Sequence, residues 1–270
     1  MSSCAPARQC RGLDSCIEGA LRCKVDPAHL PSICCNSKFK SYRRNCYADN
    51  NPQPFPIVAA FLRLGNKYVI PQLRAEAVKR LSAEYPSTLA NWDLSVKHLF
   101  SKLADSHGLD FDVINLAHAI GVLSLVPAAM YSFCERDALE EVLEGVVRED
   151  GSMLILSAEN QRVLVRGWKI LRGLLHTETY KWLDTQDAGM FYDCVQRVKC
   201  DTTRRQLFYD YFRGRSVCYA LSEWAMVGET GLCGPCLQKS KTLHEAGRAN
   251  VWNKLPSVFG LPEWDELLQE

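Results

Sequence analysis

The pair Cys233 and Cys236, which encloses Gly and Pro, is the motif of this sequence with the clearest chemical potential. Two cysteines at this spacing can form a redox dithiol at the start of a helix, or they can supply two of the four ligands of a structural zinc site. The redox function requires an apolar strand directly before the motif and a βαβ layout around it. Residues 228–231 read Gly-Glu-Thr-Gly and few residues follow Cys236, so the sequence disfavours thioredoxin-like catalysis.

A zinc site at this pair would need two further ligands. His244 and Cys218 are the candidates that we consider, and the alternative is a metal-free structural pair of thiols. Among the other histidines, which show no paired metal spacing, His118 is expected to be a core residue with one hydrogen-bond partner. No residue is assigned to a catalytic, cofactor-binding or metal-binding site, and no cofactor is expected. The other scattered histidines are His29, His98, His107 and His176.

The N-terminal segment, residues 1–51, differs from the rest of the chain in its cysteines and its charge. Seven of the 13 cysteines fall within residues 1–46, at spacings that fit neither a disulfide framework nor a zinc site. Residues 1–50 hold eight Lys and Arg against four Asp and Glu, and they contain few large apolar residues. These features predict a basic, poorly ordered leader with reduced thiols.

The overall composition is that of an ordinary globular protein, with 47% hydrophobic residues, 23% charged residues and a net charge of +1. This near-neutral charge provides no basic field for nucleic acid or for an anionic membrane surface. No apolar run reaches the ~18 residues of a membrane-spanning helix, and the first residues lack the apolar core of a signal peptide. We therefore expect no nucleic-acid or membrane partner, and a location in the cytoplasm or the nucleus.

Apolar residues recur at helical spacing from about residue 55 onward. Ile57, Phe61 and Leu64 share one helix face, and Pro71 opens a second helix that ends before Pro86. Only Met153–Leu156 reads as a short extended piece. The predicted fold is all-α, a helical array of about eight to ten helices. Further helices are predicted at residues 113–123, 127–133, 137–147 and 204–213, and from Ser157 to Leu175, where we expect the longest one.

Two aromatic-rich segments are predicted to be structural. In residues 204–213 the apolar side chains form i, i+4 pairs, which favours a helix packed on the core over base stacking on a nucleic acid. The arginines of that helix, Arg204, Arg205 and Arg213, are expected to lie outside the core. Near the C-terminus, Pro256 and Pro262 interrupt a run of large apolar residues that should dock against the helices as a strap. The residues of this strap are Trp252, Leu255, Phe259, Leu261 and Trp264.

Three segments of the helical region share the pattern of one known family. Residues 61–89 read FLRLGNKYVIPQLRAEAVKRLSAEYPSTL, and residues 114–134 read INLAHAIGVLSLVPAAMYSFC. Residues 233–267 hold a cysteine pair, Leu-Pro, and Phe-Gly-Leu-Pro followed by a Trp. These segments resemble the closing BTB helices, the BACK-like helical pair and the terminal pattern of BTB/POZ proteins from mushroom-forming fungi. The resemblance implies BTB-like helices at residues 52–105 and a BACK-like extension with the C-terminal strap at 106–270.

The resemblance also implies a function, that of a non-enzymatic protein-interaction module. Its partner would be a protein, either a cullin scaffold or a substrate for which the chain is an adaptor, and homo-oligomerisation is a further option. Nothing in residues 1–53 resembles the front half of a BTB domain. This indicates either a truncated paralogue with an unrelated leader or a gene model with a wrong first exon, so no docking residue is transferred.

Two alternatives to the interaction module stay open. One is a zinc- or thiol-dependent protein that uses Cys233 and Cys236. The other is a truncated gene product without activity, whose helices would expose an apolar patch where they normally face the absent sheet. The residues of that patch would include Phe61, Leu64, Leu73 and Leu81.

Overall fold

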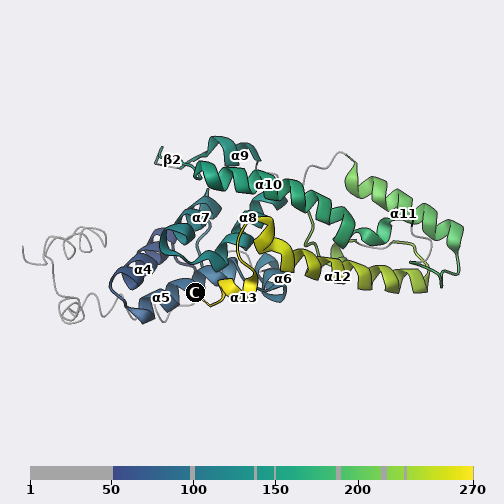
Figure 1. Ribbon diagram of the computed structural model, residues 1–270, viewed down its shortest axis with the longest axis horizontal. Helices are drawn as coiled ribbons and strands as arrows, with labels where there is room; N and C mark the ends of the chain where they lie inside the picture. Colours follow the sequence, from purple (N-terminus) through teal and green to yellow (C-terminus); the bar gives the residue numbers. More distant parts are fainter. Residues whose placement is uncertain are drawn as a thin grey trace, which may run out of the picture.

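The computed structural model describes residues 51–97, 101–136, 139–148, 150–186, 190–213, 218–227 and 230–269. These residues form an elongated array of ten α-helices with one two-stranded sheet, so the all-α prediction is confirmed (Figure 1). Helices α4 (Phe55–Lys67) and α5 (Pro71–Glu84) lie at one end of the array, and α11 (Arg197–Phe212) lies at the other. The predicted leader lies outside the described residues, apart from Asn51.

Helices α4 and α5 form a tightly packed pair because Gly65 lets their backbones approach. A Cβ atom at Gly65 would lie 2.6 Å from the backbone nitrogen of Arg74, so a larger residue would push the two helices apart. Pro71 occupies the first turn of α5, where its missing N–H needs no partner. Of the four residues expected to be exposed in a truncated product, Leu81 is fully buried and the other three are half-buried.

The centre of the core is built by three helices, α6 (Leu89–Lys97), α7 (Leu109–Ile120) and α8 (Val126–Arg136). Eight of the 11 residues of α8 are buried. The hydroxyl of Tyr131 on α8 donates to the carbonyl of Cys218 at 3.2 Å and accepts from the N–H of Leu221 at 2.9 Å, so the core also fixes a distant loop. His118 lies on the exposed face of α7, so the prediction of a core histidine is wrong.

A short helix and a β-hairpin replace the longer helix predicted at residues 137–147. Helix α9 covers Leu139–Glu144, and β1 (Val146–Val147) pairs antiparallel with β2 (Met153–Leu154). Gly145 separates the helix from the hairpin with a φ of 83°, a backbone conformation that favours glycine. The predicted helix therefore ends at residue 144, whereas the extended piece predicted at 153–156 is confirmed in its first half.

Two long helices, α10 (Ala158–Leu174) and α12 (Gly234–Val258), pack against each other along the array. Ser157 caps α10 as predicted, because its hydroxyl accepts a hydrogen bond from the N–H of Asn160 at 3.1 Å. The longest described helix is nevertheless α12, with 25 residues against 17 for α10. The sequence pattern misses this helix because its buried face includes the polar residues Ser240, His244 and Arg248.

Helix α12 also packs against the π-helix Leu175–Thr179 that continues α10. Gly247 permits this contact, since a Cβ atom there would lie 2.3 Å from the carbonyl oxygen of Glu178. The short 3-10 turns Leu123–Leu125, Lys181–Leu183 and Trp224–Val227 complete the connections between the helices.

The predicted strap is correct only for the residues after α12. Trp252 and Leu255 belong to α12 itself, whereas Trp264 begins the four-residue helix α13 (Trp264–Leu267). The rings of Trp252 and Trp264 stack with centroids 5.5 Å apart, and the indole N–H of Trp264 donates to the carbonyl of Trp252 at 3.0 Å. The C-terminal residues therefore dock on the end of α12.

One hydrophobic core cluster runs through the described residues from Phe55 to Phe259. The domain boundaries expected near residues 51 and 105 stay predictions. None of the described helices combines the length and the apolar character that crossing a membrane requires.

Candidate metal centre

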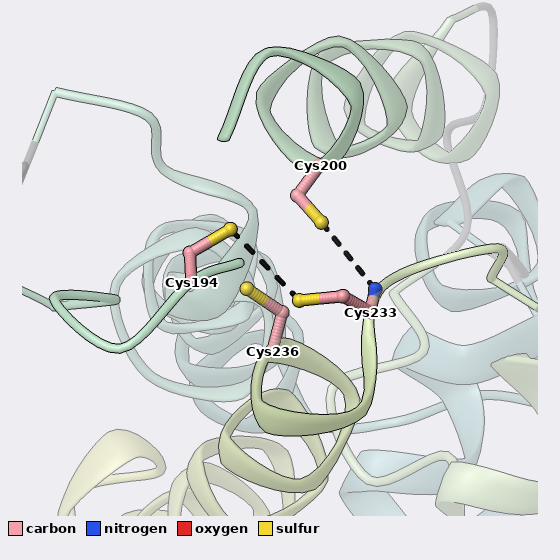
Figure 2. Close-up of side chains that lie close together, drawn as sticks. All are labelled: Cys194, Cys200, Cys233 and Cys236. Carbon is pink, nitrogen blue, oxygen red and sulfur yellow. Dashed lines mark hydrogen bonds between the residues drawn. The ribbon is translucent and has the colours of Figure 1, made fainter. Parts of the chain in front are cut away.

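Four cysteines converge at the end of the array where α11 lies and α12 begins (Figure 2). Cys233 and Cys236 come from the start of α12, Cys200 comes from α11, and Cys194 comes from the loop before α11. Three of them are buried and Cys194 is half-buried. The structure therefore joins the predicted pair to two cysteines that no sequence motif had singled out.

The sulfur atoms of this four-cysteine cluster all lie within 4.8 Å of one another. The Sγ atoms of Cys194 and Cys233, joined by a dashed line in Figure 2, are 3.9 Å apart. Four thiolates that bind a zinc ion tetrahedrally at ~2.3 Å have their sulfur atoms about 3.8 Å apart. The cluster therefore has the dimensions of a site for a single tetrahedral metal ion.

The N-terminus of α12 positions two of the four thiols. Cys233 is the N-cap residue of this helix, and Pro235 lies in the first turn, where proline is tolerated. The backbone N–H of Cys233 donates to the Sγ atom of Cys200 at 3.4 Å, which links the start of α12 to α11. Because a helix N-terminus carries unpaired N–H groups and the positive end of the dipole, it favours thiolates over thiols.

The thiols of the cluster differ in acidity. Burial raises the pKa of Cys233, but the backbone N–H groups of Cys236 and Val195, together with the neighbouring thiols, lower it to about 6. Burial raises the pKa of Cys200 and of Cys236. A metal ion that binds here would displace the thiol protons, because the thiolate and not the thiol is the metal ligand.

The first half of helix α11 has few apolar contacts of its own. Of its 16 residues, only Cys200 and Arg204 are buried. Apolar residues near its C-terminus are half-buried against the core, whereas Phe208, which was expected inside, is 45% exposed. The prediction that Arg204 lies outside the core is wrong, because its guanidinium carbon lies 3.8 Å from the centroid of the buried Phe191 ring. The cluster is therefore the main anchor for the first half of α11.

His244, which we considered as a zinc ligand, does not belong to the cluster. It is buried, and both of its ring nitrogens have partners. The indole N–H of Trp182 donates to Nδ1 at 3.3 Å, and Nε2 donates to the carbonyl of Ser222 at 2.8 Å. Burial lowers the pKa of His244, which keeps the ring neutral. This histidine is a structural residue of the core.

Cys218, the other ligand considered, also lies elsewhere. Its backbone N–H donates to the carbonyl of Cys134 at 3.4 Å, and both side chains are buried. Burial raises the pKa of Cys218 to about 12, so its thiol keeps its proton. The residues that join Cys233 and Cys236 are therefore Cys194 and Cys200, and neither His244 nor Cys218, the two options considered from the sequence, is among them.

Cys194 and Cys200 give only a weak sequence signal. Five residues separate them, which departs from the usual spacing of two to four in zinc sites. A second, indirect signal is the composition of residues 197–206, RVKCDTTRRQ, in which Val198 is the only large aliphatic residue. A helix without an apolar face needs another anchor, and a metal ligand can provide it.

The chemistry of the cluster favours metal binding over redox catalysis. A redox dithiol uses two cysteines, whereas four converge here. Four protein ligands leave no open position on a tetrahedral ion, which is typical of structural zinc and not of catalytic zinc. No family model, curated protein or solved structure matches this chain.

Proposed function

We propose that this chain binds one zinc ion through the four-cysteine cluster and that the ion is structural. The convergence of the four sulfur atoms within 4.8 Å of one another is the observation that supports this proposal. Among biological cations, zinc combines an affinity for thiolates with a preference for tetrahedral sites. The bound ion would join α11 and the loop that carries Cys194 to the start of α12.

The wider function that we propose is a non-enzymatic protein-interaction module of BTB/POZ type. Its support is the resemblance of three segments, the last of which includes Cys233 and Cys236. Large apolar side chains near the cluster also lie in solvent, since Tyr192 is 85% exposed, Val195 72% and Val198 82%. Exposed apolar groups that lie together are typical of protein contact sites. A zinc ion that holds Cys194 would fix the loop that presents Tyr192 and Val195.

The partner proposed on the resemblance is a cullin scaffold or a substrate protein, with the chain as an adaptor between them. A second copy of the chain is the further option. The cytoplasm or the nucleus is the location that fits this function, because a reducing compartment keeps the four thiols available to the metal.

The zinc proposal is tested on the purified full chain by elemental analysis. We expect about one zinc per chain, and less than a tenth of that in the double variant Cys233→Ser/Cys236→Ser. The matched control is Cys134→Ser/Cys218→Ser, which removes two buried thiols outside the cluster and should keep the zinc. A wild-type chain that is folded and free of zinc after expression with added zinc would contradict the proposal. Bound iron in place of zinc would support the four-cysteine cluster as a metal site and contradict zinc as its metal.

The interaction proposal needs a defined partner. Purified full chain and a purified cullin from a mushroom-forming fungus can be mixed and examined by size-exclusion chromatography with light scattering. A complex of one chain per cullin would support the adaptor function. Elution as separate proteins at tens of micromolar would reject it, and the mass of the chain alone would report homo-oligomers.

A further inference from the structure

Arg204 is an unusual residue for the inner face of a helix. Its side chain is 2% exposed, and its guanidinium lies over the ring of Phe191, with the guanidinium carbon 3.8 Å from the ring centroid. The phenylalanine ring is itself fully buried. A long cationic side chain rarely occupies such a position unless its charge is compensated.

The hydrogen bonds of Arg204 compensate only part of its charge. Its Nη2 group donates to a carboxylate oxygen of Asp201, which is 24% exposed and is shared with Arg197 at 3.4 Å. The Nε and Nη1 groups of Arg204 are buried and have no hydrogen-bond partner. The local group of two arginines and one aspartate therefore has a net charge of +1. A buried cation with unused donors is costly, so a negative charge nearby should be part of the working structure.

The position of Arg204 in α11 places it beside the four-cysteine cluster. It follows Cys200 by four residues, so the two side chains lie on the same face of the helix, and they are the only two buried residues of α11. Long side chains on a helix extend toward its N-terminus, which for Arg204 is the direction of Cys200, and the contact with Asp201 agrees with this direction. Phe191, whose ring the guanidinium contacts, precedes Cys194 by three residues.

The negative charge of a zinc-loaded cluster is opposite in sign to the net positive charge of the group formed by Arg204, Arg197 and Asp201. A zinc ion with four thiolates carries a net charge of −2, and this charge would be buried at the junction of α11 and α12. We propose that Arg204 is the buried counter-charge of the four-cysteine centre and sets its affinity for zinc. This inference rests on the proposed zinc site and concerns a residue that positions and stabilises the ligands without binding the metal.

The test is a measurement of zinc affinity on the full chain by competition with a chromophoric chelator. Replacement Arg204→Met keeps much of the side-chain volume and removes the charge, and we expect zinc binding to weaken roughly 10–100-fold, as for other outer partners of metal ligands. Arg204→Lys restores the charge without the planar group and should recover part of the affinity. The matched control is Arg205→Met, the next residue along the helix, which is exposed and should bind zinc like the wild type.

A second readout separates this role from ordinary packing. In the metal-free chain the charge of Arg204 has no thiolate cluster to balance, so Arg204→Met should not lower the melting temperature there. In the zinc-loaded chain the same replacement should lower it. A merely structural Arg204 would lower the melting temperature equally in both forms, and that result would overturn the inference.

The outcomes also distinguish this inference from the zinc proposal. A wild-type chain that binds no zinc would contradict the proposed function. A wild-type chain that binds zinc, together with an Arg204→Met variant of equal affinity, would contradict only the role of Arg204. If Arg204→Met does not fold, the comparison of Arg204→Lys with Arg205→Lys decides, since the first alone should weaken zinc binding. The absorption of bound Co²⁺ would show whether the four thiolate ligands are kept in each variant.

Discussion

Helices α8 and α11 differ in what holds them in place, since α8 lies inside the array and α11 lies at one end of it. Eight of the 11 residues of α8 are buried, whereas α11 buries only Cys200 and Arg204 among its 16 residues. The first helix is stabilised by apolar burial at ~1.5–3 kcal/mol for each large side chain. The second has a thiol and a cation at its two buried positions, and its apolar residues near the C-terminus are only half-buried, so the stability of its first half should depend on what those two groups bind.

This comparison divides the array into two ends. The core end comprises α4 to α8, and the cysteine end comprises the four-cysteine cluster with α11 and the first turns of α12. If the proposal is correct, the core end folds by apolar packing alone, while the cysteine end folds with its metal. The following changes test this division, in order of decreasing expected effect.

Removal of the metal should have the largest effect, and it should be local. Structural zinc contributes on the order of 10 kcal/mol to small zinc-dependent domains, so Cys236→Ser should abolish the stable packing of α11. Hydrogen exchange measured by mass spectrometry should show lost protection in α11 and in the first turns of α12. Protection of α8 should stay unchanged. Equal loss of protection at both ends would contradict the division.

Truncation of a core residue should destabilise the core end whether or not zinc is bound. Phe133 on α8 is 1% exposed and its ring contacts Phe111 edge-on at 4.8 Å. Phe133→Ala should cost roughly 3–5 kcal/mol through lost burial and the cavity that remains. Urea denaturation with and without a zinc chelator should give the same decrease in the free energy of unfolding. A decrease that depends on zinc would show that the two ends are coupled.

Added volume at the crossing of α12 and the π-helix should have a moderate effect. A Cβ atom at Gly247 would lie 2.3 Å from the carbonyl oxygen of Glu178, and backbone cannot move away as a flexible side chain can. Gly247→Ala should therefore cost roughly 1–3 kcal/mol. Gly173→Ala is the control, because a Cβ atom there meets no atom within 4 Å. A Gly247→Ala melting temperature at or above that of the control would contradict this account.

The ion pair between Lys254 and Glu178 should have the smallest effect. Its atoms are 2.6 Å apart, but the lysine is 49% exposed, so Lys254→Ala should cost only about 0.2–1 kcal/mol. The hydrogen bond from Lys254 lowers the pKa of Glu178, so the pair stabilises the fold above the ordinary carboxyl pKa. This contribution is lost as the pH falls through the lowered pKa. The difference in melting temperature between wild type and Lys254→Ala should shrink on acidification, and a constant difference would contradict the assignment.

The sequence predicts the core end better than the cysteine end. Apolar periodicity locates α4, α5, α7 and α10, because apolar residues recur there every three to four residues. In α4 the predicted stripe of Ile57, Phe61 and Leu64 is only half-buried, and the fully buried face lies beside it. Gly145 ends a predicted helix early, since a hairpin contact with β2 overrides the local helical pattern. Helix α12 escapes the pattern because its buried face includes Ser240, His244 and Arg248, which read as polar.

The sequence alone predicts only two of the four cysteines of the candidate site. Cys233 and Cys236 are only three residues apart in the sequence and form a known motif, whereas Cys194 and Cys200 join them through tertiary structure. The same holds for Arg204, which the i, i+4 pairing of its neighbours placed outside. A buried cation beside ligands from another helix follows no local rule, because its compensation comes from residues distant in the chain.

The length of α12 has a consequence for how variants of this protein combine. Cys233 and Trp252 are 19 residues apart along this helix, so at about 1.5 Å per residue roughly 28 Å separate Cys233 from the stacked rings of Trp252 and Trp264. Changes at sites this far apart, without shared contacts, usually have additive effects on stability. A library of substitutions at the tryptophan pair and another at the cysteines should therefore combine without epistasis, so each end can accumulate changes independently of the other.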